Sequence, residues 1–137
     1  MAPAGYSGTP LARKLGIRAD SVVVLLGAPD GFEDLLDDLP DGVRFRRRAR
    51  GRFGLALTFQ TERATLERRL AALLAALDQD GAIWVAWPKK ASKVPTDITE
   101  DTVREVVLPI GLVDVKVCAI DDVWSGLKVV RRKELRR

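Results

Sequence analysis

Five consecutive apolar residues, Val22 to Leu26, limit the folds open to this chain more than any other segment. A strand with one face in water alternates apolar and polar residues, so an unbroken apolar run predicts a strand that is buried on both faces. A turn with two glycines follows at Gly27–Gly31, and Asp30 and Glu33 have the spacing of a cap at the start of a helix. A doubly buried strand, a glycine turn and a helix start are typical of the first unit of a nucleotide-binding α/β domain.

Strand and helix patterns alternate along the rest of the chain. Helices are expected at residues 10–16, 32–39 and 100–108. A further helix is expected to begin after Thr61, its cap, and to end at Asp80-Gly81. Strands are expected at residues 43–46, 53–59, 82–87, 113–120 and 127–132. Strands joined through a helix run parallel, whereas the last two strands form a hairpin. The sequence therefore predicts a single α/β domain over residues 1–137, a Rossmann-like, three-layer, mostly parallel six-stranded sheet with an antiparallel C-terminal hairpin strand. Residues 1–9 are expected to form a flexible arm and residues 133–137 a basic tail.

The absence of histidine from all 137 residues is the most useful fact in the composition. It excludes Ser-His-Asp and Cys-His hydrolysis and nearly all zinc catalysis, which depend on imidazole. We assign no catalytic residue and no metal ligand. A single cysteine, Cys118, an N-terminus without a secretory signal and no apolar run near 20 residues favour the cytoplasm and no membrane association. The net charge of +4 gives little support to nucleic-acid binding by itself.

The candidate site follows from the expected sheet. In open parallel sheets, ligands bind beyond the carboxyl ends of the strands, where the strand order reverses. We expect that reversal between strands 22–26 and 53–59, with loop cations near a helix start that favour an anionic ligand. Trp87 would supply a stacking face, and Ser92 and Thr96 would supply hydroxyl groups. The predicted ligand-binding residues are Gly27, Pro29, Asp30, Gly31, Arg46, Arg48, Trp87, Lys89, Lys90 and Ser92.

Two groups of cations have alternative interpretations. One is the arginine segment, which consists of Arg44, Arg46, Arg47, Arg48, Arg50 and Arg52. It is either a solvated loop that pairs with the acidic segment before it, or a loop that binds phosphate or nucleic acid. Lys89 and Lys90 are likewise either a solvated loop or an anion clamp.

One of the two tryptophans in strand 82–87 is expected to be structural, and so are Cys118 and Trp124. Trp84 and Trp87 are an odd number of residues apart, so they point to opposite faces of their strand. Cys118 is expected to be a small buried hydrophobic residue without a cation beside it. Trp124 is placed at the hairpin turn.

The order of these elements resembles the S-adenosylmethionine-dependent methyltransferase fold, a Rossmann-like sheet whose last strand runs against the others. The resemblance implies the spatial order 2-1-3-4-6-5, with one β-α unit missing after residues 43–46, and it makes S-adenosylmethionine a candidate cofactor. Three features depart from that family. The turn Gly27–Gly31 has two glycines instead of three and includes Pro29, acidic side chains follow it, and Arg46-Arg-Arg48 replaces the acidic residue that would hold the ribose hydroxyls.

Four motifs are similar to a family of small bacterial proteins of unknown function. These motifs are Tyr6–Ile17, Gly27–Phe32, Trp84–Ser92 and Trp124–Lys128, and together they extend over nearly the full length. This second resemblance implies no activity.

The sequence therefore predicts a non-catalytic binding or regulatory domain for an anionic ligand, nucleotide-like or phosphorylated. Two alternatives stay open: a reduced S-adenosylmethionine-dependent methyltransferase, and a nucleic-acid-binding accessory protein that uses the arginine segment and the tail. Pairing of two copies through an exposed edge strand is a third open question, because an unpaired edge can bind another strand.

Overall fold

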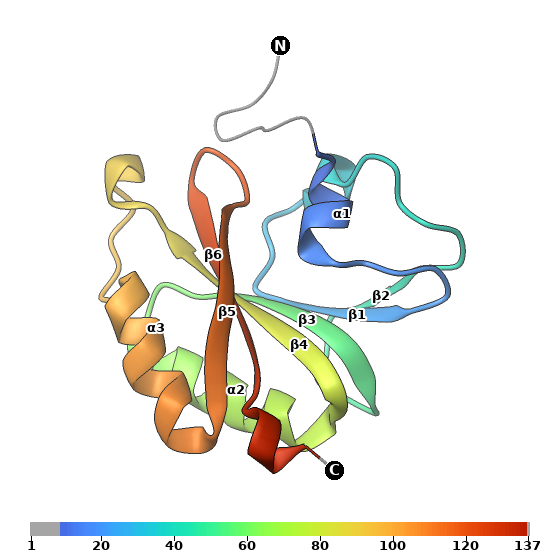
Figure 1. Cartoon of the computed structure of the whole chain (residues 1–137). Coiled ribbons are helices and arrows are strands. Elements are labelled where there is room, and N and C mark those ends of the chain that lie inside the picture. Colours follow the sequence, from blue (N-terminus) through green and yellow to red (C-terminus); the bar gives the residue numbers. More distant parts are fainter. Residues whose placement is uncertain (1–8, 137) are drawn as a thin grey trace.

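The computed structural model describes residues 9–136, and six strands form one sheet in the order β2-β1-β3-β4-β6-β5 (Figure 1). The strands are β1 (Val22–Leu26), β2 (Arg44–Arg46), β3 (Phe53–Phe59), β4 (Leu77–Pro88), β5 (Leu112–Ala119) and β6 (Trp124–Arg131). The first four run parallel, and β6 is antiparallel to both β4 and β5. The predicted strand order and antiparallel strand are thus confirmed. All of the predicted arm except Thr9, and the last residue of the tail, lie outside the described part.

Helices cover the two faces of the sheet unequally. The α-helices are α1 (Leu11–Leu15), α2 (Arg63–Ala76) and α3 (Glu100–Val107); short 3-10 turns are η1 (Phe32–Leu35), η2 (Lys90–Ser92), η3 (Leu108–Ile110) and η4 (Lys133–Leu135). One hydrophobic cluster joins α2 and α3 to the sheet, and a second joins α1 and η1 to the opposite face (Figure 1). The architecture is three-layered with one thin layer. Within residues 9–136, no helix has the length and apolar character needed to cross a membrane.

The first strand is buried on both faces, as its apolar run predicts. Val23 and Leu25 belong to the cluster under α1, whereas Val24 and Leu26 belong to the cluster under α2 and α3. Each of these four side chains is at most 6% exposed. Burial on both faces therefore explains why β1 has no polar residue.

The thin layer is attached to the sheet by a tryptophan. Trp84 and Trp87 point to opposite faces of β4, as predicted, and Trp84 lies in the cluster under α1. Its indole N–H donates a hydrogen bond of 2.9 Å to the carbonyl of Leu15, at the end of α1. Gly16 then ends this helix in the left-handed conformation with φ of 81°. Helix α1 is short, but its last carbonyl is fixed on the centre of the sheet.

The prediction of a helix at residues 32–39 is wrong. The chain forms only the 3-10 turn η1, and Gly31, with φ of 75°, occupies the N-cap position without a side-chain hydrogen bond. Asp30 therefore does not cap a helix. Glu33 does not reach back to the cap, because its carboxylate accepts hydrogen bonds of 2.7 Å from Arg47. The chain turns again at Asp38, whose φ is 59°.

The predicted ends of helix α2 are also corrected. Glu62, not Thr61, occupies the N-cap position, and the cap comes from a distant loop: the carboxylate of Asp97 accepts a 2.7 Å hydrogen bond from the N–H of Arg63. The N–H of Asp97 donates in return to the carbonyl of Thr61. The helix stops at Ala76, because the buried Leu77 already pairs with Phe53 as the first residue of β4.

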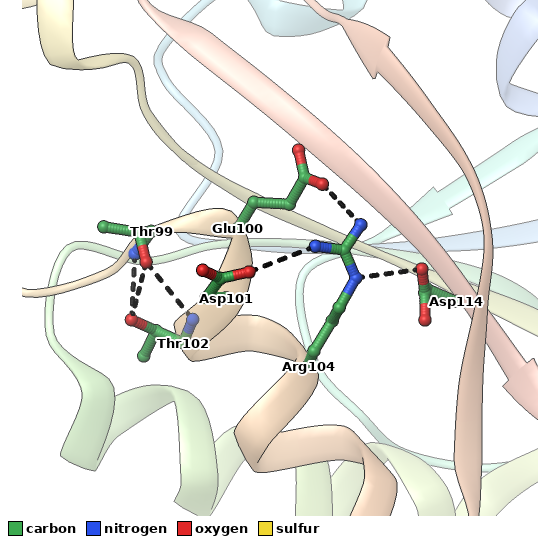
Figure 2. Close-up of polar contacts among 6 residues, drawn as sticks. All are labelled: Thr99, Glu100, Asp101, Thr102, Arg104 and Asp114. Atoms are coloured by element: carbon green, nitrogen blue, oxygen red, sulfur yellow. Dashed lines mark hydrogen bonds and ion pairs between the residues drawn. The ribbon is translucent and has the colours of Figure 1, made fainter.

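Helix α3 begins as predicted and is tied to the edge strand (Figure 2). Thr99 and Thr102 form a reciprocal capping box at its start. The guanidinium of Arg104 contacts Glu100 and Asp101 on the same helix and Asp114 on β5, the last at 3.1 Å. The hydrogen bond to Glu100, followed by that to Asp114, raises the pKa of Arg104 above its usual value. Arg104 therefore joins α3 to β5 as a permanent cation.

The outer edge of the sheet is interrupted on the β5 side. The register of β5 against β6 shifts between Asp114 and Lys116, which leaves Val115 as an extra, 56% exposed residue. A bulge of this kind bends the strand and breaks its row of outward-facing backbone groups.

Replacing Asp97 by alanine removes the only side-chain oxygen that caps α2 in the described part of the chain. We expect Asp97→Ala to lower the free energy of unfolding by about 1 kcal/mol, measured by urea denaturation. Asp37→Ala is the matched control, because Asp37 is exposed and should change stability by less than about 0.5 kcal/mol. Equal stability of the two variants would contradict the assignment of Asp97 as the cap.

Candidate functional site

The carboxyl edge of the sheet begins at Gly27, directly after β1. Gly27 is exposed and adopts φ of 70°. A Cβ atom at this position would lie 2.5 Å from the carbonyl oxygen of Phe59, at the end of β3. The close approach of the two strand ends, as well as the left-handed backbone, therefore requires glycine here.

A row of aromatic rings occupies this edge on the α1 side. Phe32 and Phe59 are buried, and their ring centroids lie 5.0 Å apart in an edge-to-face arrangement. Trp124 contacts Phe59 in the same way at 5.2 Å. Trp124 was expected in the hairpin turn, but it is the first residue of β6 and pairs with Pro88. The row joins η1, β3 and β6, so side chains fill the space beside Gly27 on this face.

Gln60 is a polar residue of this edge that the sequence analysis missed. It is 8% exposed, and its amide group donates a 2.7 Å hydrogen bond to the buried hydroxyl of Thr58. A Cβ atom at Gly27 would lie 3.8 Å from the amide nitrogen of Gln60. The sequence contains a signal that could have identified Gln60: it is a polar residue directly after a strand that is buried on both faces, at the edge where ligands bind.

Trp87 and the two hydroxyl residues are not available in the way that was predicted. Trp87 is only 6% exposed and belongs to the cluster under α2 and α3, so it offers no stacking face. The hydroxyl of Ser92 donates to the carbonyl of Lys89, and that of Thr96 donates to the carbonyl of Thr61. The first contact lies within the loop after β4, and the second joins that loop to the segment before α2.

The arginine segment lines an open pocket of about 500 Å³, which we call the arginine cavity. It is lined by Arg46, Arg47, Arg48, Arg50 and Gly51. The guanidinium of Arg46 donates a 2.8 Å hydrogen bond to the carbonyl of Arg50, which closes the loop on itself. Its lining does not include Lys89 or Lys90, because β2 and β4 are separated by β1 and β3, a spacing of about 14 Å. The expectation that the lysines and arginines converge in one pocket is wrong.

The arginine segment also replaces the missing β-α unit. Residues 47–52 return the chain from the carboxyl end of β2 to the amino end of β3. Arg47 pairs with Glu33 near the first end, and Arg52 pairs with Asp78 near the second, at 2.7 and 3.1 Å. Arg48 and Arg50 have no carboxylate partner within residues 9–136. Pairing with acidic residues thus accounts for Arg47 and Arg52, and within the described residues the guanidinium groups of Arg44, Arg48 and Arg50 are unpaired.

Cys118 differs from expectation, and Asp121 has a role in the turn between β5 and β6. Cys118 is only partly buried, and burial raises the pKa of its thiol, while the charges of Lys14 and Lys116 act in the opposite direction. Cations therefore do lie near this thiol. The carboxylate of Asp121 accepts hydrogen bonds from two backbone N–H groups of the β5–β6 turn. Across the described residues, no three histidine, cysteine or acidic side chains form a metal-binding group.

The comparisons with known proteins concern the fold. No protein-family model and no curated protein sequence matches the chain. Solved structures do match the chain. A ribosomal protein L11 methylase from Lactobacillus delbrueckii subsp. bulgaricus is similar with a TM-score of 0.58 and 10% sequence identity, and the match covers 89% of this chain and 75% of the methylase chain. Magnesium protoporphyrin IX methyltransferase from Synechocystis with bound S-adenosylmethionine gives 0.56 at 9% identity, over 89% and 74%. TrmN from Thermus thermophilus gives 0.56 at 14% identity, over 89% of this chain and 47% of its own.

The fold is methyltransferase-like. The structure is consistent with a shortened version, with six strands, few helices and an antiparallel C-terminal strand. At these identities the likeness concerns the backbone, so the side chains decide whether the cofactor of such enzymes fits.

The described edge fits S-adenosylmethionine at the glycine turn but not at the end of β2. The exposed backbone at Gly27 allows close approach of a ligand, as nucleotide-binding turns require. The last residue of β2, where an acidic side chain would accept hydrogen bonds from the ribose hydroxyls, is Arg46. No transfer step is therefore derived through this cofactor.

Two alanine substitutions separate close packing from backbone conformation at the turn. Gly27 and Gly31 both have positive φ, but a Cβ at Gly31 would meet only the Asp34 carboxylate, at 3.6 Å. We expect Gly27→Ala to lower the free energy of unfolding by about 2 kcal/mol or more, and Gly31→Ala by about 1 kcal/mol. Thermal and urea unfolding measure both. Equal losses would show that β1 and β3 do not approach closely at Gly27.

Proposed function

We propose that this chain is a reduced member of the S-adenosylmethionine-dependent methyltransferase class and binds an adenosyl ligand at the Gly27–Gly31 turn. The observation that carries this proposal is the sheet order, in which the last strand in sequence, β6, runs antiparallel between β4 and β5, together with the likeness to methyltransferase structures. In such sheets the ligand position lies beyond the carboxyl ends of the strands flanking the reversal, here β1 and β3. The exposed turn at Gly27 occupies that position.

The proposal names binding residues and no catalytic residue. Gly27 would let the ligand approach the backbone, and Gln60 would offer its amide beside the turn. When bound, S-adenosylmethionine supplies a methyl group activated for transfer. Because Arg46 replaces the expected ribose-binding acid, we expect affinity for adenosyl compounds to be limited by the ribose contact.

A second candidate function is binding of a phosphorylated or nucleotide-like anion in the arginine cavity. It is supported by the guanidinium groups of Arg48 and Arg50, which have no carboxylate partner in the described chain. The hydrogen bond from Arg46 to the Arg50 carbonyl holds the loop in place before any ligand arrives. Arginine pairs well with phosphate, because its planar fork donates two parallel hydrogen bonds. Structural similarity to methyltransferases supports the first candidate more directly than this one.

One substitution gives opposite results for the two candidates. Arg46→Asp places a carboxylate at the end of β2, so under the first proposal it should tighten binding of S-adenosylhomocysteine roughly tenfold, about 1.4 kcal/mol. Under the second, it removes one cation and introduces repulsion, so phosphate-bearing ligands should bind more weakly. Isothermal calorimetry with S-adenosylhomocysteine, adenosine 5′-diphosphate and pyrophosphate separates these outcomes.

Arg44→Asp is the matched control, since it makes the same charge change at the other end of the exposed strand β2. It should leave both affinities within about twofold. If neither the wild-type protein nor Arg46→Asp binds S-adenosylhomocysteine at millimolar concentration, the first proposal fails. Binding of RNA that weakens steeply with salt, without binding of small phosphates, would instead favour a nucleic-acid role for the arginine segment.

A further inference from the structure

A second cationic cavity lies between α1 and β5, at the opposite edge of the sheet from the arginine cavity. Its volume is about 480 Å³. It is lined by Thr9, Arg13, Lys14, Lys116, Val117, Cys118 and Ala119. Neither the sequence analysis nor the methyltransferase-like fold predicts a ligand there. We call it the α1–β5 cavity.

The lining of the α1–β5 cavity has three cations and no carboxylate. Arg13 and Lys14 come from α1, whereas Lys116 comes from β5. The ammonium nitrogen of Lys116 lies 3.4 Å from the carbonyl oxygen of Lys14, so this contact fixes β5 against α1 beside the cavity. Cations that converge from separate elements repel one another unless an anion lies between them.

The pKa of the Cys118 thiol is affected by the positive charge of the cavity. The charges of Lys14 and Lys116 both act to lower the pKa of its thiol, although burial outweighs them. The thiolate form is thus favoured by the cations that an anionic ligand would contact. Since the chain has one cysteine, the reactivity of its thiol measures this cavity alone.

We propose that the α1–β5 cavity binds a small phosphorylated anion. Its volume lies within the range of about 300–1,000 Å³ typical of small-molecule sites. Three positive charges around one concave space match a compact polyanion such as a diphosphate group, whereas an extended nucleic-acid backbone is matched by charges spread along a surface. The hydroxyl of Thr9 adds a possible hydrogen-bond donor to a phosphate oxygen. This proposal is independent of the one at Gly27.

The test is alkylation of Cys118 by iodoacetamide in the native full chain, with and without inorganic pyrophosphate, at constant ionic strength. Bound pyrophosphate covers the thiol and offsets the charges of Lys14 and Lys116, so alkylation should slow roughly threefold or more. Protection is expressed for each variant as the ratio of its two rates, because Lys116→Ala also alters the unprotected rate. Lys116→Ala and Arg13→Ala should each reduce protection. Lys133→Ala, which removes an exposed lysine in η4 outside the cavity, should retain it.

Each of the following outcomes overturns the proposal. Millimolar pyrophosphate does not slow alkylation of the wild-type protein, or sodium chloride of the same ionic strength slows it equally. Alternatively, pyrophosphate still protects both Lys116→Ala and Arg13→Ala fully. Protection by single-stranded RNA without protection by pyrophosphate also overturns it in favour of nucleic acid. Calorimetry with S-adenosylhomocysteine is unaffected by any of these results, so this proposal and that for the Gly27–Gly31 turn can fail separately.

Discussion

The hydrogen bond from the Trp84 indole to the carbonyl of Leu15 supports the thin layer of this fold. The central strands are buried on both faces, so both faces must be covered, yet within residues 9–136 the only α-helix on one side has five residues. A helix this short is unstable by itself in water. The indole satisfies a carbonyl at the helix end while its ring fills the space below. Together with the buried Leu15, it allows five residues to cover a face for which longer helices are usual.

The β-α unit that is missing between β2 and β3 is replaced by a segment of positively charged residues. The segment 47–52 must return from one end of the sheet to the other without a helix, and its two ends are held by ion pairs to Glu33 and Asp78. The arginines between them then face solvent. Arg46 is the last residue of β2, directly before this segment. The glycine turn and the arginine segment support different proposed ligands, which is why one substitution at Arg46 separates the two candidate functions.

Short-range patterns predicted much of the fold. The apolar runs of β1 and β3 and the start of the helix at Glu100 depend on neighbours in sequence, and the structure confirms them. The cap of α2 could not be predicted, because Asp97 lies 34 residues beyond Arg63. Glu33 in the short η1 turn pairs with Arg47, a contact between the arginine segment and the acidic segment before it that the sequence analysis included as one interpretation. The glycine turn after β1 is present, with positive φ at Gly27 and Gly31, and its role in binding stays a prediction. The proposed meeting of lysines and arginines failed because two strands separate them.

The bulge at Val115 has a consequence for how molecules of this protein meet one another. A regular edge strand offers continuous hydrogen-bonding positions to a neighbour, and crowded proteins with such edges can stack into fibrils. Here the irregularity at Val115, followed by the charge of Lys116, interrupts that template in the middle of β5. The exposed valines of this edge can then remain in water at high protein concentration without recruiting strands from other copies.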